Sequence, residues 1–435
     1  MFEIIVKQAG VEVGSFEVAV TGTAAEREEQ VLEAGRRVGR MLLEPSLAEV
    51  ADQSTVPRCC GYAMNCRDRR GITLKTLTGE VPLVRHRYRC ERCHHAVYQG
   101  DAVIRCGRHL VTRPLAKRIC QLAETEHYTR LPQLLADQHG VRMDHQEINE
   151  LVRAIGGQAE ERRRAEAAAW QRIPADRRAW PDPLVRPERI SVSVDGVMYC
   201  TNETEPDPYQ PGRRRLVWQQ MRVGCVFWQA APGHWDKRVV WGRESAEEFG
   251  AALCRLAWQC GWNEAREKLF GADGADWCWA IHQRYFSQAT GILDWYHASE
   301  HVWQAAHLVA REEPAARQWA HEALDRLRTA GGEGLEAWLV DQRLALRGTR
   351  RAAVEQLLTY VRPRIDWMHY PQFRAHGWQV GTGMIESTGK QLVGSRLKGP
   401  GMHWTEAGAL AITALRAIDL NGQWHSHWNT LTLST

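Results

Sequence analysis

The order of β-rich and helical segments between residues 189 and 295 is the feature that most limits how this chain can fold. Three β-rich runs come first, at 189–200, 217–230 and 237–242. Helical and β-rich segments then alternate, at 245–261, 267–272, 275–287 and 290–295. Three successive strands followed by helix–strand alternation predict a mixed α/β (α+β) sheet with helices packed against it.

Changes in composition divide the rest of the chain. Residues 297–380 are rich in Ala, Leu, Arg, Glu and Trp at helical spacing, which predicts an all-helical insertion in the α/β domain. A charged helix at 160–169 that runs into three prolines within 174–183 predicts a linker. The segments expected from these shifts are a strand pair and helix (1–50), a Cys-rich module (51–110), a helical region (111–157), the linker (158–188), two parts of the α/β domain (189–297 and 381–435) and the insertion between them (298–380).

Composition excludes several classes of protein. The 435 residues carry 56 Lys and Arg against 52 Asp and Glu, a formal net charge of +4, and 44% of them are hydrophobic. This is typical of a globular protein, not of a disordered or fibrous one. No apolar stretch is long enough for a membrane helix and the N-terminus lacks a signal-peptide pattern, so we expect a cytoplasmic protein with no membrane partner.

Positive charge is concentrated in one stretch. Residues 58–90 carry eight Lys and Arg against two acidic residues, a local balance of 8 − 2 = +6. Such an excess favours a polyanionic partner.

Three carboxylates lie on separate segments of the predicted α/β domain. Asp195 is on the polar side of an alternating strand, Asp273 ends the strand at 267–272, and Glu386 lies on a helix entered through glycines. Each also has an ordinary structural explanation, namely an Asp-Gly turn, a helix N-cap and an i,i+4 pair with Lys390. Taken together, they predict a site for Mg²⁺, because sites form at the carboxyl ends of strands and Mg²⁺ prefers carboxylate oxygens.

Two further positions belong with this set. Asp294 ends the strand before the insertion, and His297 follows at a spacing that shares one face if a helix begins there. The spacing agrees with a metal-binding pair and with a hydrogen-bonded pair that orients the turn. Asp276 competes with Asp273 as a site residue, but only Asp273 directly ends the apolar strand.

These motifs, in this order, resemble those of bacterial DDE transposases. The likeness is closest to the ISKra type of insertion-sequence transposase, which is distantly similar to Mutator-like transposases, and it covers nearly the whole chain. Its most specific pieces are Val194-Asp195-Gly196, GADGADW at 271–277, the DxxH of Asp294 and His297, and Gly-Met-Ile-Glu386 followed by SRLKGPGMHW at 395–404.

The resemblance implies an RNase H-like catalytic domain that cuts the ends of a mobile DNA element and transfers them to target DNA. The family's acidic triad falls on Asp195, Asp273 and Glu386, which would bind Mg²⁺ or Mn²⁺, and its accessory pair falls on Asp294 and His297. It also implies double-stranded DNA as partner, a homodimer or larger homo-oligomer, and association with the nucleoid.

The sequence leaves open which residues contact DNA and whether the chain is an active transposase. Arg396 and Lys398, just after the glutamate helix, are candidates for contact with the DNA backbone, although solvated surface charge explains them equally well. Two alternatives to a transposase are an RNase H-like DNA nuclease without strand transfer and a catalytically inactive, transposase-derived DNA-binding regulator. Intact carboxylates at all three triad positions argue against the inactive form.

The clustered cysteines predict a zinc-ribbon-like module. Cys90 and Cys93 form a CxxC knuckle, and a second pair of zinc ligands has to come from Cys59, Cys60 or Cys66. Because neighbouring cysteines do not easily bind one ion, the expected set is Cys60, Cys66, Cys90 and Cys93, with His94 and His95 as substitutes. A metal-free hairpin is the alternative.

The helical region that follows predicts a helix-turn-helix. A helix at 131–139, a turn at 140–142 and a helix capped by Asp144 give this pattern, and Glu147 adds a capping-box-like start. Arg142, Gln146 and Asn149 then lie where base or phosphate contacts are made. Helical hairpins of this size also serve as dimerisation modules.

Overall fold

The computed structural model describes residues 1–53, 55–180, 182–431 and 433. By its internal contacts the chain divides into two compact units. The first unit contains Met1–Gln158 and a C-terminal segment that starts at Trp424, and the second contains Ala159–Gln423. Within the described residues, no helix combines the length and apolar character needed to cross a membrane.

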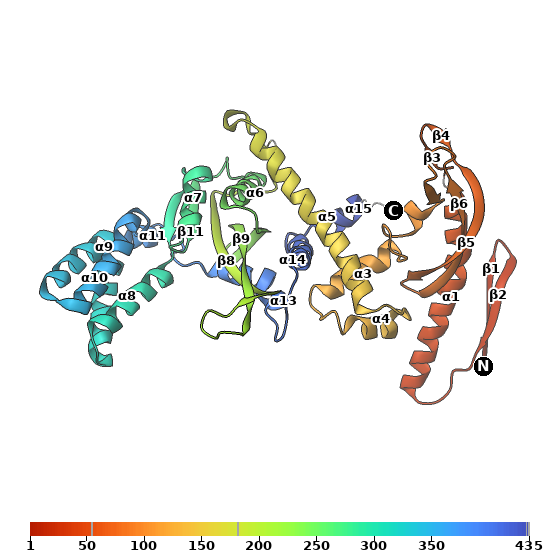
Figure 1. Ribbon diagram of the computed structural model, residues 1–435, viewed down its shortest axis with the longest axis horizontal. Helices are drawn as coiled ribbons and strands as arrows, with labels where there is room; N and C mark the ends of the chain where they lie inside the picture. The colour runs from red at the N-terminus through yellow and green to blue at the C-terminus, as the bar shows by residue number, and fades with distance from the viewer. Residues whose placement is uncertain (54, 181, 432, 434–435) are drawn as a thin grey trace. The chain divides into compact units, whose positions relative to one another are not determined.

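The second unit is built on a five-stranded mixed sheet with the strand order β10-β9-β8-β11-β12 (Figure 1). Its strands are β8 (Arg189–Pro206), β9 (Arg214–Ala231), β10 (His234–Gly242), β11 (Glu267–Ala272) and β12 (Thr290–Leu293). The first three strands pair antiparallel, whereas β11 runs parallel to β8 and β12 runs parallel to β11. The mixed α/β sheet predicted from the segment order is therefore confirmed.

Apolar alternation explains how the sheet is covered. Ile190, Val192 and Val194 of β8 are fully buried in the main core. Helices α6 (Ala246–Gln259) and α7 (Asp276–Tyr285) pack against the sheet in this core. Helix α6 begins with a complete capping box, in which Ser245 and Glu248 satisfy each other's backbone N–H groups. The resulting core holds the central strands in place.

A group of helices follows β12, as the helical spacing predicts (Figure 1). It comprises α8 (Trp295–Val309), α9 (Glu313–Ala345), α10 (Gly348–Val361), the short 3₁₀ helix η2 (Arg362–Trp367) and α11 (Tyr370–Ala375). Helix α9 is kinked at Gly331, whose φ of 68° and ψ of −161° are not helical. That conformation favours glycine, which has no Cβ to clash.

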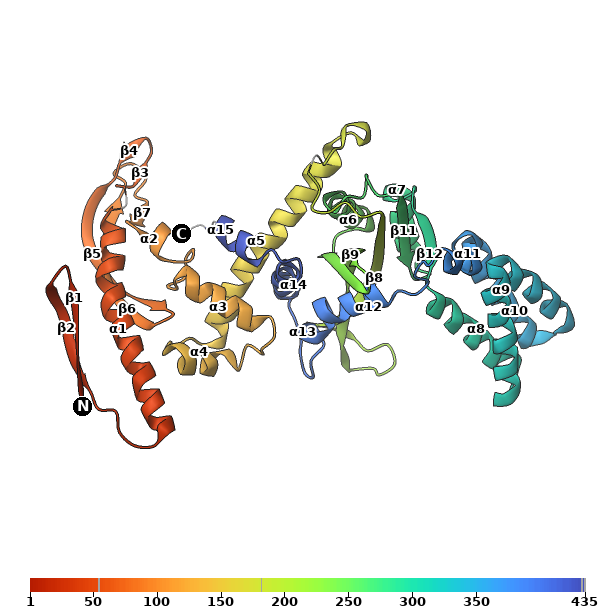
Figure 2. The ribbon, with the colours of Figure 1, turned by 180° about the vertical axis from the view of Figure 1, so that it is seen from behind.

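The chain then returns to the sheet. Helix α12 (Gly383–Gly389) is followed by a π-helical turn, η3 (Lys390–Gly394), and by α13 (Ser395–Leu397) and α14 (Glu406–Leu420). Helix α12 packs against β8 and β9, beside which it lies in Figure 2. The insertion therefore separates β12 from α12 in sequence but not in space.

The first unit contains small sheets and helices. Its strands are β1 (Phe2–Gln8), β2 (Val11–Val18), β3 (Arg58–Cys59), β4 (Tyr62–Ala63), β5 (Asn65–Thr76), β6 (Gly79–Arg89) and β7 (Ala96–Tyr98). Its helices are α1 (Ala24–Gln53), α2 (Asp101–Ile104), α3 (Arg113–Ala123), α4 (Leu131–His139), the first half of α5 (His145–Arg172) and α15 (Trp424–Thr430).

One helix is longer than expected, and one segment boundary differs from the prediction. The charged helix predicted over 160–169 is part of α5, which runs without a break from His145 to Arg172. The reason is that helix formers persist up to the proline at position 174. The end of the predicted 381–435 segment belongs to the first unit, where Arg113 donates hydrogen bonds to the carbonyls of Trp428 (3.4 Å) and Leu431 (2.7 Å).

Candidate active site

The registry of the parallel strands places three aspartates at one edge of the sheet. Val194 of β8 pairs with Ala272 of β11, and Ala272 pairs with Leu293 of β12. The residues that follow these three are Asp195, Asp273 and Asp294. Because side chains alternate along strands, residues at equal register face the same way. The three carboxylates therefore gather where β11 and β12 end, beside the middle of the longer strand β8.

Side chains from helices α8 and α12 complete a cavity of about 180 Å³ around this edge. Its lining includes all five residues that the sequence predicts as catalytic, namely Asp195, Asp273, Asp294, His297 and Glu386. It also includes Glu300, a carboxylate that the sequence analysis missed, whose Oε2 lies 3.9 Å from Nδ1 of His297. The i,i+3 spacing of Glu300 from His297 is the signal that could have identified it.

Asp195 carries the clearest electrostatic sign of a cation site. Burial raises the pKa of its carboxyl above the ordinary value, and the negative charges of Asp273 and Glu386 raise it further. The backbone N–H of Gly196, 2.6 Å from Oδ1, opposes this shift by donating a hydrogen bond. Oxygen ligands that repel one another around a cavity fit Mg²⁺ or Mn²⁺, because a divalent cation relieves the repulsion.

Asp273 and its competitor Asp276 have different surroundings. Asp273 lines the cavity, and its Oδ1 accepts hydrogen bonds from the backbone N–H of Ala275 (2.9 Å) and the thiol of Cys278 (3.4 Å). The side chain of Asp276 is fully exposed and lies 3.4 Å from Arg364. The N-cap residue of α7 is Ala275, so the capping explanation does not account for Asp273.

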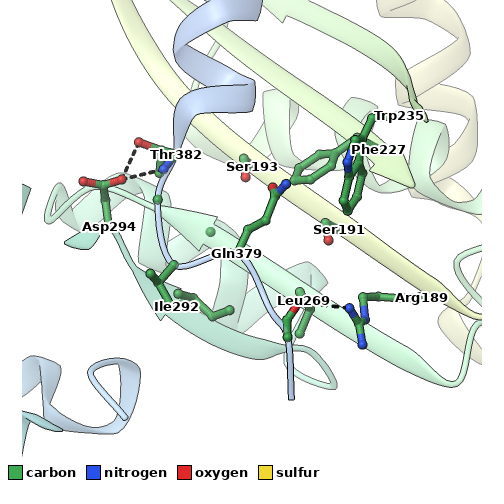
Figure 3. A pocket seen from close by; sticks show the side chains of 14 residues that line it. Arg189, Ser191, Ser193, Phe227, Trp235, Leu269, Ile292, Asp294, Gln379 and Thr382 are labelled. Carbon is green, nitrogen blue, oxygen red and sulfur yellow. Dashed lines mark hydrogen bonds between the residues drawn. The ribbon is translucent and has the colours of Figure 1, made fainter. Parts of the chain in front are cut away.

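Asp294 is buried, and the structure supplies hydrogen-bond donors to both of its oxygens. Oδ1 accepts from the backbone N–H of His297 (2.6 Å), which makes Asp294 the N-cap of α8. Oδ2 accepts from the backbone N–H (2.5 Å) and the hydroxyl of Thr382 (2.7 Å), as the dashed lines in Figure 3 show. Asp294 and Thr382 also line a smaller pocket of about 20 Å³ on the other side of this contact. Each carboxylate oxygen of Asp294 therefore accepts a hydrogen bond from a backbone N–H group, that of His297 or that of Thr382.

Helix α12 presents Glu386 to the cavity and is held from two directions. The hydroxyl of Thr382 lies 2.9 Å from Oε1 of Glu386. On the other side, Nζ of Lys237 in β10 donates to the hydroxyl of Thr388 (3.0 Å) and to Oε1 of Gln391 (2.8 Å). These bonds fix the helix next to its π-helical turn, a distortion that is frequent at functional sites.

The predicted DNA contact at Arg396 is wrong. Only 2% of Arg396 is exposed, and its guanidinium lies over the ring of Trp404, 4.8 Å from the centroid. The reason is that the chain turns back after α13, where the backbone N–H of Trp404 donates to the carbonyl of Cys200 (3.1 Å). Lys398 is exposed, so a DNA contact remains a prediction for that residue.

Four cysteine sulfurs of the first unit lie within 4.8 Å of one another, and they belong to Cys59, Cys60, Cys90 and Cys93. The expected ligand Cys66 is not in this group, since its thiol lies 3.5 Å from Nδ1 of His86 instead. Cys60 has a left-handed backbone (φ 50°), which lets the side chains of two adjacent cysteines converge. This conformation was not foreseen from the sequence, and it replaces Cys66 by Cys59.

The chemistry of this four-cysteine cluster fits zinc. Backbone N–H groups of Cys93 and Arg92 donate to the sulfur of Cys90 and lower the pKa of its thiol to about 7. Structural zinc takes four thiolates in a tetrahedral arrangement. The four cysteines are therefore suitable ligands for one zinc ion.

Helices α4 and α5 form the helical pair that the sequence predicts. Gly140, at a φ of 63°, ends α4, and Oδ1 of Asp144 accepts a hydrogen bond (2.8 Å) from the backbone N–H of Glu147 in the first turn of α5. The carboxylate of Glu147 pairs with Nζ of Lys75 at 2.6 Å. Of the residues proposed to bind DNA, Arg142 and Gln146 are exposed and Asn149 is half-buried.

Comparison with known proteins gives a distant likeness in structure and no match in sequence. No protein-family profile matches the sequence, and no curated protein matches it. A solved structure, the strand transfer complex of the Drosophila P element transposase, overlaps 72% of this chain and 93% of its own chain at a TM-score of 0.31 and 7% identity. A likeness of this size does not assign a family or a function, so the function proposed below depends on the residues of the cavity.

We predict that Asp195→Asn stabilises the protein in the absence of metal. The raised pKa of Asp195 means that the fold disfavours the charged carboxylate, so removing the charge at neutral pH should raise the thermal unfolding midpoint. The difference between the variant and the wild type should shrink as the pH falls through the pKa of Asp195, because the wild-type carboxyl is then neutral as well. Thermal scans at several pH values in chelator test this.

For the cysteine cluster we predict one zinc ion per chain. Cys59→Ser and Cys93→Ser should each lose the zinc and lower the unfolding midpoint, while Cys66→Ser should keep both at wild-type values. Metal analysis after purification, with a chromogenic chelator to follow release, measures the content. Loss of zinc in Cys66→Ser with retention in Cys59→Ser would contradict the assignment.

Proposed function

We propose that this chain is a DDE transposase of the ISKra type with an RNase H-like catalytic domain. The observation that carries the proposal is the cavity at the carboxyl end of β11, beside Asp195 of β8, where Asp195, Asp273 and Glu386 converge from three separate elements. Sites in α/β sheets form at this edge. Carboxylates that repel one another there are suited to divalent cations, the cofactors of phosphodiester chemistry.

The proposed reaction has two displacements at phosphorus. In the first, a water oxygen attacks a phosphodiester at the end of the mobile DNA, and the bond between phosphorus and the 3′ oxygen breaks to leave a 3′-hydroxyl. In the second, that hydroxyl attacks a phosphorus of the target DNA, and the target's 3′ oxygen leaves. Bound Mg²⁺ or Mn²⁺ supplies charge neutralisation and lowers the pKa of the attacking water or hydroxyl.

The residues of the chain have separate parts in this proposal. Asp195, Asp273 and Glu386 would hold the cations. His297, half-buried in the wall of the cavity, is placed to contact a phosphate oxygen or the leaving oxygen. Asp294 fixes the backbone where α8 begins, so its part is structural rather than metal-binding.

The first unit supplies the proposed DNA recognition. The Arg-rich hairpin β5–β6 carries exposed Arg69 and Arg89 beside the four-cysteine cluster, and α4–α5 exposes Arg142 and Gln146. Positive charge binds the phosphate backbone, while polar side chains on a helix contact base edges. Because a mobile DNA has two ends, we further propose that the chain acts as a homodimer or larger homo-oligomer on double-stranded DNA in the nucleoid.

The direct test is cleavage of DNA that carries the flanking ends of this protein's own gene. With Mg²⁺ or Mn²⁺, we expect nicks at those ends, and we expect Asp195→Ala, Asp273→Ala and Glu386→Ala to lose at least ~100-fold of the rate. Asp276→Ala is the matched control and should cleave like the wild type. End binding without cleavage by the wild type under both metals would leave a DNA-binding regulator, and cleavage without joining would leave a nuclease.

Binding to those ends gives a second prediction. Arg142→Ala and Gln146→Ala should each weaken specific binding, by roughly 1–3 kcal/mol for a base contact. Arg69→Ala should weaken binding to all sequences and make the salt dependence shallower, because a phosphate contact carries no sequence information. Titrations with specific and scrambled duplexes at several salt concentrations separate the two effects. Arg130→Ala, an exposed change at the start of α4, serves as a control for helix stability.

A further inference from the structure

The two ends of the helical insertion meet at one residue pair. Asp294 is the last residue before α8, and Thr382 is the residue before α12, so the whole insertion lies between them. Thr382 gives its backbone N–H (2.5 Å) and hydroxyl (2.7 Å) to Oδ2 of Asp294. The backbone N–H of Trp295 donates to the carbonyl of Val380 at 2.9 Å and closes the same junction. The junction is therefore held by hydrogen bonds from both chain segments.

The hydroxyl of Thr382 reaches a second carboxylate. It lies 2.9 Å from Oε1 of Glu386, one helical turn further on, whose backbone N–H donates to the Thr382 carbonyl (3.1 Å). A threonine hydroxyl has one hydrogen and can donate it to one carboxylate at a time. Asp294 and Glu386 therefore compete for this hydrogen.

The two competitors differ in what else binds them. Asp294 is 3% exposed and also receives the backbone N–H groups of His297 and Thr382. Glu386 is exposed and lines the cavity together with Asp195 and Asp273. Because Asp294 already accepts from two backbone N–H groups, the hydroxyl hydrogen is available to Oε1 of Glu386 and can hold that carboxylate in place while a cation binds it.

We propose that Thr382 is a positioning residue that holds the carboxylate of Glu386 in its cation-binding orientation and links that orientation to the junction of the helical insertion. The inference rests on the function proposed above, because it takes Glu386 as a metal ligand. Partners that orient a ligand are worth about 10–100-fold in metal affinity when they are lost. Thr382 acts only through Glu386 and Asp294, and its backbone contact with Asp294 does not depend on the side chain.

The test compares Thr382→Val, which keeps the shape and loses the hydroxyl, with Thr382→Ser, which keeps the hydroxyl. Thr359→Val is the matched control, because it makes the same substitution at an exposed position of α10 where the hydroxyl donates to the backbone carbonyl of Glu355 and not to a carboxylate. Binding of Mn²⁺ alone, without DNA, is measured by titration calorimetry. We expect Thr382→Val to weaken Mn²⁺ binding about 10-fold or more, and the serine and control variants to bind like the wild type.

A second readout separates positioning from general damage. The cleavage rate of Thr382→Val should recover at saturating Mn²⁺, because the defect lies in binding the cation and not in the chemical step. Thr382→Ala, which also lacks the hydroxyl and adds no bulk, gives the same comparison if the valine variant does not fold. Wild-type Mn²⁺ affinity in a folded variant without the hydroxyl would overturn the inference and leave the proposed function intact. Failure of the wild type to bind Mn²⁺ would overturn both.

Discussion

Parallel pairing of β8 with β11 and of β11 with β12 is the constraint on which the rest of the second unit depends. This register brings the residues after Val194, Ala272 and Leu293 to one level at one edge of the sheet. Without it, three aspartates up to 99 positions apart, from 195 to 294, would not share a cavity. The fully buried side chains of β8 hold the register, because a slip by one residue would turn Asp195 to the opposite face.

The sequence was sufficient to predict the parts that follow from periodicity. Alternation in β8 and the apolar run of β11 located the strands, and the position of Asp195 and Asp273 relative to those strands predicted their convergence. The helical spacing after His297 likewise predicted the insertion, although α8 begins at Trp295. These patterns are local, and tertiary contacts did not override them. The roles of the carboxylates stay predictions until cation binding and cleavage are measured.

Other features depend on contacts between residues far apart in the chain, which one sequence does not display. The sequence predicted an exposed cation at Arg396. It is buried because the backbone of Trp404 hydrogen-bonds to β8 and the ring of Trp404 packs against the guanidinium. Cys59 takes the place of Cys66 in the four-cysteine cluster because Cys60 adopts a left-handed backbone conformation. That conformation cannot be predicted from the residue type. Thr382 was passed over because its importance lies in distances to Asp294 and Glu386 across the insertion. Sequence reasoning failed where side chains meet at specific distances.

The C-terminal segment has a consequence for how the protein is made. Arg113, the first residue of α3, donates hydrogen bonds to the backbone carbonyls of Trp428 and Leu431, which are translated after the whole second unit. Domains usually fold in order of synthesis, the N-terminal one first. Here the first unit lacks the segment from Trp424 onward until the five-stranded sheet of the second unit has been translated, so the second unit can complete its fold before the first does.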